Sequence, residues 1–80
     1  MGSPVCKAFG QNLRAIRKSK GITQERLAYE SGLDRSYMGK IERGQVNITI
    51  EKIYILANYL NCSPKALILD IDVNEKPVHK

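Results

Sequence analysis

The chain has 80 residues, of which 42% are hydrophobic, and its formal net charge is +5 at pH 7. This length allows a single domain with a modest core, and this hydrophobic content excludes an intrinsically disordered chain. No apolar run approaches the roughly 18 residues of a membrane span, and no N-terminal stretch resembles a secretory signal. We therefore expect a cytoplasmic protein that makes no contact with a membrane.

The positive charge is concentrated in the N-terminal half of the chain. Residues 7–43 contain nine Lys or Arg against four Asp or Glu, whereas residues 44–80 contain four of each. A polyanion would therefore meet one basic end of the molecule. Charge alone does not separate this interpretation from a basic surface that is only solvated.

The residues that metal binding or acid–base chemistry requires are scarce. Cys6 and Cys62 are too far apart in sequence for a compact metal clip, and the only histidine is His79. We therefore expect two reduced thiols, no metal site and no cofactor. An enzyme is not expected either, because no nucleophile with a neighbouring base, Gly-rich phosphate loop or paired-carboxylate motif is found.

The first expected helix runs from about residue 5 to residue 20. Apolar residues recur there at spacings of three and four, namely at Val5, Phe9, Leu13 and Ile16. Gly21 then provides a left-handed stop. Thr23 is a good N-cap for a second helix over residues 24–30, and Gly32 suits the sharp turn that follows it.

Asp34 caps a third expected helix over residues 35–43, whose inward-facing residues are Met38 and Ile41. The remaining face is polar and is expected to point outward, which is unusual for a helix that only packs; its residues are Arg35, Ser36, Tyr37 and Lys40. A helix, a Gly-containing turn and a second helix form the helix-turn-helix geometry, in which the second helix enters the major groove of double-stranded DNA.

Two further helices are expected in the C-terminal half. Thr49 caps a helix over residues 50–60, with Ile50 as a candidate extension of a core face made by Ile53, Leu56, Ala57 and Leu60. Ser63 and Pro64 open a short fifth helix that runs through residue 68. We expect a core domain of about residues 5–69 and a tail over residues 70–80 that is frayed or loosely docked.

Several short motifs at fixed offsets agree with one known family. They are G-I-T-Q-E-x-L-A at residues 21–28, S-G-L at 31–33, I-E-R-G at 41–44 and L-x-x-x-P-x-x-L at 60–67. With them, residues 9–68 resemble the Cro/C1-type (XRE-family) helix-turn-helix repressors. The resemblance implies an all-α, five-helix, lambda-repressor-like DNA-binding domain over residues 1–80. The run L-D-R-S-Y-M-G-K-I-E-R-G is similar to small stand-alone regulators such as the controller proteins of restriction–modification systems.

The resemblance also implies which residues bind DNA, namely Gln24, Arg35, Ser36, Tyr37, Lys40, Arg43 and Asn47. Gln24 would grip a phosphate at a helix N-terminus, and Arg35 would bind O6 and N7 of a guanine. Ser36, Tyr37 and Lys40 would each contact a base or a phosphate. Arg43 and Asn47 would contact the DNA backbone beyond the helix end. Three further basic residues are candidate phosphate contacts, with charges that are only solvated as the alternative: Arg14, Lys18 and Lys20.

Family precedent suggests that Arg17 and Glu42 form an ion pair that ties the first helix to the recognition helix; two independent surface charges are the alternative. Gly39 lies in the middle of the third expected helix, where glycine is less favourable than Ala by roughly 1 kcal/mol. It would permit close approach to DNA, or it would avoid a clash with a neighbouring helix, and the sequence does not choose between these.

An extra apolar strip at Ile55 and Tyr59 predicts a homodimer through the fourth and fifth helices, unless it packs against the C-terminal tail. The expected function is a dimeric transcriptional regulator or repressor of a palindromic operator, controlled by its own concentration, with no small-molecule ligand. The alternative functions are an antitoxin and a protein-interaction module on the same scaffold. The polar outward face of the third helix favours DNA.

Overall fold

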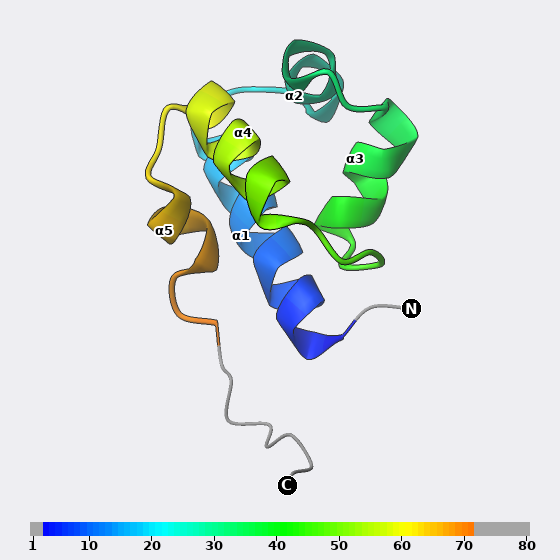
Figure 1. Ribbon diagram of the computed structural model, residues 1–80. Coiled ribbons are helices and arrows are strands. Elements are labelled where there is room, and N and C mark those ends of the chain that lie inside the picture. Colours follow the sequence, from blue (N-terminus) through cyan, green and yellow to red (C-terminus); the bar gives the residue numbers. More distant parts are fainter. Residues whose placement is uncertain (1–2, 72–80) are drawn as a thin grey trace, which may run out of the picture.

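The computed structural model describes residues 3–71, and its regular structure is entirely helical in this range (Figure 1). The five expected helices are present in the expected order, which confirms the all-α fold. They are α1 (Pro4–Ser19), α2 (Gln24–Ser31), α3 (Arg35–Glu42), α4 (Ile50–Leu60) and α5 (Pro64–Ile68).

Local capping chemistry explains where the helices begin and end. The expected N-caps are confirmed, because the side chains of Thr23, Asp34, Thr49 and Ser63 each accept a hydrogen bond from a backbone N–H of the helix that follows. Helix α2 ends at Gly32, whose φ of 75° lies in the left-handed region that glycine adopts without strain. Each helix is therefore delimited by its own sequence.

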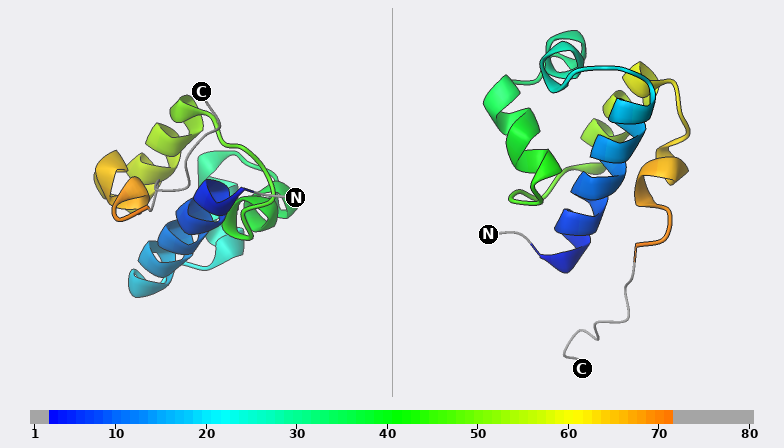
Figure 2. Two further views of the ribbon diagram at one scale, coloured as in Figure 1. Left: turned by 90° about the horizontal axis from the view of Figure 1, so that it is seen from below. Right: turned by 180° about the vertical axis from the view of Figure 1, so that it is seen from behind.

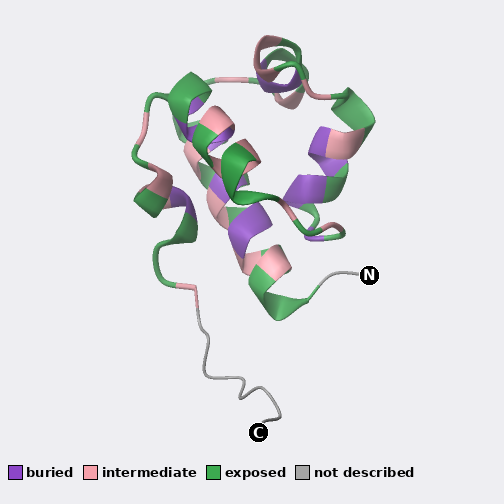
Figure 3. Cartoon of the chain, viewed as in Figure 1, coloured by how far each residue is buried: buried purple, intermediate pink, exposed green. Residues whose placement is uncertain are grey.

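The helices enclose one core. Helix α1 packs against α3 and α5, α2 packs against α3 and α4, and α4 also packs against α5. The views in Figures 1 and 2 place α3 and α5 on opposite sides of α1 and α4. Figure 3 shows the buried turns of α2, α3 and α5 on their inner sides. The buried apolar residues are Phe9, Leu13, Leu27, Ala28, Met38, Ile41, Leu56, Ala57, Leu60 and Leu67.

Three sequence-based expectations about individual side chains are wrong. Val5 is 44% exposed and Ile50 is 73% exposed, because each lies in the first turn of its helix, at the edge of the core. Tyr37 was expected to face outward, but it is half-buried and packs against the core. The ammonium group of Lys52 lies 5.5 Å from the centre of its ring, so Tyr37 links α3 to α4.

The chain after α5 is held against α1 as far as it is described. The Asn12 amide Nδ2 donates to the backbone oxygen of Leu67 at 2.9 Å and to that of Leu69 at 3.0 Å. Ile71 then packs against the core. The remainder of the expected tail, with His79, lies outside the described residues.

The crossing of α1 and α3 is so close that only glycine fits at residue 10. A Cβ atom on Gly10 would lie 2.5 Å from the backbone oxygen of Ile41 and closer still to that of Glu42. Backbone oxygens in a helix cannot move aside cheaply, so Gly10 sets the distance at which α3 docks on α1.

We predict that Gly10→Ala lowers the free energy of unfolding by about 1–3 kcal/mol, because the added methyl group overpacks the α1–α3 contact. Chemical denaturation measures this change, with Gln11→Ala, at an exposed position of the same helix, as the control. Helix propensity alone predicts the opposite sign, a gain of about 1 kcal/mol, and that result would contradict the close approach.

Candidate nucleic-acid interface

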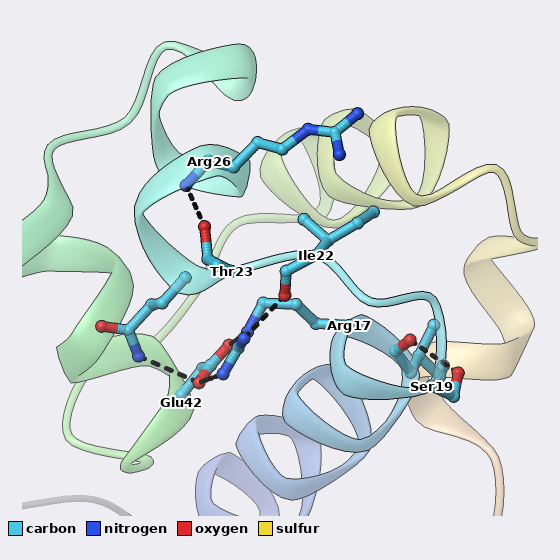
Figure 4. A network of polar contacts seen from close by, with 8 residues as sticks. Arg17, Ser19, Ile22, Thr23, Arg26 and Glu42 are labelled. Atoms are coloured by element: carbon cyan, nitrogen blue, oxygen red, sulfur yellow. Dashed lines mark hydrogen bonds and ion pairs between the residues drawn. The ribbon is translucent and has the colours of Figure 1, made fainter.

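A buried ion pair positions α3 relative to α1 (Figure 4). Arg17 Nε lies 2.6 Å from Glu42 Oε2, and Arg17 Nη2 donates to Glu42 Oε1 at 3.0 Å. The third guanidinium nitrogen, Nη1, donates to the backbone oxygen of Ile22 at 2.8 Å. Both charged residues are only 7% exposed, so the structure contains the pair that the family resemblance implies, not two independent surface charges.

Gln24 brings α2 into the same network. Its amide Nε2 donates to Glu42 Oε1 at 3.0 Å. A carboxylate only accepts hydrogen bonds, so the amide nitrogen must face Glu42 and the amide oxygen must face the other way. One side-chain N–H of Gln24 is thereby used within the protein. The backbone N–H groups at the start of α2 remain the better donors for a phosphate.

The other side of Gln24 opens onto a polar cavity between α2 and α3. The cavity has a volume of about 350 Å³, and its lining residues are Gln24, Arg35, Ser36, Gly39 and Arg43. Four of these five were expected from the sequence to bind DNA, and the fold brings them together. Arg35 and Ser36 are exposed at the first turn of α3, where the Asp34 carboxylate caps the helix by accepting from the Ser36 and Tyr37 N–H groups.

The remaining residues that were expected to contact DNA do not line this cavity. Lys40 is exposed on α3. Asn47 is exposed in the loop between α3 and α4, and its Oδ1 accepts a hydrogen bond from the Cys6 thiol at 3.1 Å. Tyr37 is half-buried, so it has less surface to offer than was expected. Gln45, whose Oε1 accepts a hydrogen bond from Arg43 Nε at 3.2 Å, was not among the residues expected from the sequence.

Residues 3–71 also contain apolar, acidic and thiol side chains outside this surface. No helix in this range is long and apolar enough to cross a membrane. No three potential metal ligands among His, Cys, Asp and Glu gather there. The Cys62 thiol packs against the core, and burial raises its pKa above the usual value although Lys20 lies nearby. A protonated, half-buried thiol is a weak nucleophile.

Comparison with known proteins assigns the family. The helix-turn-helix family model (HTH_3) matches residues 13–67, which span α2, α3 and α4 and most of the fold. The chain therefore belongs to this XRE-type helix-turn-helix family of transcriptional regulators.

Three of the similar proteins are control or controller proteins. The chain is 45% identical over 60 residues to control protein C.SmaI of Serratia marcescens, which covers 74% of this chain and 71% of the relative. It is 43% identical over 61 residues to control protein C.BamHI of Bacillus amyloliquefaciens, which covers 75% of each chain. The crystal structure of the restriction–modification controller protein C.AhdI from Aeromonas hydrophila superposes with a TM-score of 0.75 at 50% identity, and the match covers 78% of this chain and 94% of that one.

We predict that Glu42→Ala lowers the free energy of unfolding by about 3–5 kcal/mol, because it leaves the Arg17 guanidinium buried without its partner. The double variant Arg17→Met with Glu42→Leu should lose less stability than Glu42→Ala, since it removes both charges and retains apolar volume. Thermal or urea unfolding of the two variants tests this order. A double variant less stable than Glu42→Ala would contradict the explanation.

Proposed function

We propose that this protein is a sequence-specific regulator that binds double-stranded DNA by inserting α3 into the major groove. The observation that supports this most strongly is the exposed polar face at the start of α3, where Arg35 and Ser36 stand beside the N-terminus of α2. Helix α2 would lie across the phosphate backbone while α3 reads base edges.

The residues on this surface match the chemistry of duplex DNA. An arginine at the start of the recognition helix is suited to O6 and N7 of a guanine, and a serine accepts several bases or a phosphate. Lys40 is exposed on α3 and Asn47 is exposed in the loop between α3 and α4, and both are proposed to contact the edge or backbone of the duplex. The local excess of basic residues over residues 7–43 would steer the protein to DNA.

We further propose that two copies pair through α4 and α5 and bind a palindromic operator. Tyr59 is 45% exposed and Ile55 is half-buried on α4, and an apolar groove runs between α4 and α5. Since α5 and α3 lie on opposite sides of the α1 and α4 pair, the pairing surface leaves the DNA surface free (Figure 2). A symmetric dimer presents two recognition helices to half-sites about 34 Å apart.

The similarity to control proteins supports a more specific role. Because C.SmaI, C.BamHI and C.AhdI carry that description, we propose that the chain regulates restriction–modification genes in the cytoplasm. Selection of bound duplexes from a random DNA pool at near-physiological salt tests the whole proposal. An inverted repeat that recurs upstream of such genes would support it. Recovery of no motif, with binding that vanishes as salt rises, would overturn it.

We predict that Arg35→Ala weakens binding to the selected duplex by roughly 1–3 kcal/mol and removes the preference at one base pair. Fluorescence anisotropy with single-base variants of the duplex measures both effects. Arg26→Ala is the matched control, because Arg26 is an exposed arginine of α2 whose Nε is paired with Glu30 at 3.1 Å. If Arg35→Ala weakens binding to random DNA by the same factor, Arg35 contacts a phosphate and does not read a base.

We predict that Tyr59→Asp shifts the protein from dimer to monomer in sedimentation, because it places a charge within the proposed apolar interface. Ile55→Asp should act in the same way. The control is Tyr29→Asp, since Tyr29 is 86% exposed and belongs to α2, not to α4 or α5. If the Tyr59 variant remains a dimer, the interface lies elsewhere.

A further inference from the structure

Gly39 lines the cavity between α2 and α3, next to the side chains of Gln24 and Arg43. It is buried, although it occupies the face of α3 that carries Arg35 and Arg43 at spacings of four residues on either side. A Cβ atom on Gly39 would come within 3.0 Å of Arg43 Nη1 and 3.6 Å of Gln24 Oε1. The nearest atoms are side-chain ends, not the backbone of a neighbouring helix, so relief of a helix–helix clash does not explain this glycine.

The position of the Arg43 guanidinium follows from that contact. Four residues correspond to about 6 Å along a helix, so Arg43 reaches back from the end of α3 over Gly39 toward Arg35. Its Nε donates to Gln45 Oε1 at 3.2 Å, which holds the side chain in place. Among the described residues, no hydrogen bond occupies its two terminal amino groups, and these are a pair that can bind O6 and N7 of a guanine together.

The lining of the cavity also favours a base edge over a phosphate. Gln24 Oε1 faces away from Glu42 toward Gly39, and an amide oxygen has no hydrogen bond to offer a phosphate oxygen. The edge of a base pair in the major groove presents donors and acceptors side by side, which suits a guanidinium next to an amide oxygen.

We propose that Gly39 is a positioning residue that makes room for the Arg43 guanidinium, and that Arg43, seated there, reads a base edge as a second specificity determinant beside Arg35. This inference rests on the proposed DNA-binding function. It reassigns Arg43 from a contact with the DNA backbone beyond the helix end to a reader of sequence. It also explains why a helix-weakening residue occupies the middle of α3.

A double-mutant cycle tests the inference on the full chain and the duplex recovered by selection. The proteins are the wild type, Gly39→Ala, Arg43→Ala and the double variant, and the readouts are the Kd for the selected, single-base-changed and random duplexes together with the thermal midpoint. Arg43→Ala should weaken binding to the selected duplex by about tenfold, remove the preference at one base pair and leave random duplexes nearly unaffected.

Gly39→Ala should raise the thermal midpoint by about 4 °C, because Ala is the better helix former, while it weakens specific binding several-fold. In the Arg43→Ala background, Gly39→Ala should cost no further affinity. Additive losses would mean that Gly39 acts by admitting the DNA itself, which overturns the seating role.

Arg43→Ala could instead weaken binding to all duplexes equally and reduce the slope of log Kd against log salt concentration by about one. That result would make Arg43 a phosphate contact and would overturn its role as a reader of sequence. In either of these cases the wild type still binds its selected duplex, so the proposed function stands without the inference. A wild type that selects no duplex would overturn both.

Discussion

The Glu42 carboxylate is buried where α1, α2 and α3 meet, and its three hydrogen bonds hold these helices together. Two come from Arg17 on α1 and one from Gln24 at the start of α2, while Glu42 itself is the last residue of α3. A carboxylate buried without such partners costs several kcal/mol, so the helices cannot separate at this point without leaving a charge uncompensated. Gly10 allows the approach of α1 and α3 that places the two charged groups in contact.

This network prepares the surface that we propose meets DNA. By engaging the Gln24 amide nitrogen, Glu42 turns the amide oxygen toward Gly39 and the cavity. Helices α2 and α3 therefore present a pre-arranged set of donors and acceptors, which would reduce the entropy lost on the proposed DNA binding. The opposite side of the molecule has an apolar groove between α4 and α5, which is suited to contact with a second copy of the chain. The proposed DNA surface and the proposed dimer surface therefore lie on different sides of the fold.

Most of the fold was predictable because it is determined locally. Thr23, Asp34 and Thr49 cap their helices through hydrogen bonds to neighbouring residues, and such bonds can be recognised in sequence. Contacts between distant segments were harder to predict. The exposure of Val5 depends on where the core ends, and the burial of Tyr37 on where α4 packs. The site residues came from family resemblance, whereas the relation of Gly39 to Arg43 depends on a side-chain conformation that no sequence pattern records.

The most direct test of the account is an NMR titration that follows the arginine Nε–H signals as the selected duplex is added. If the Glu42 network is already formed in the free protein and α3 enters the groove, the signals of Arg35 and Arg43 should shift. The Arg17 signal should be sharp from the start and remain in place. Unchanged signals from Arg35 and Arg43, with shifts confined to Arg14 on α1, would contradict the proposed DNA surface.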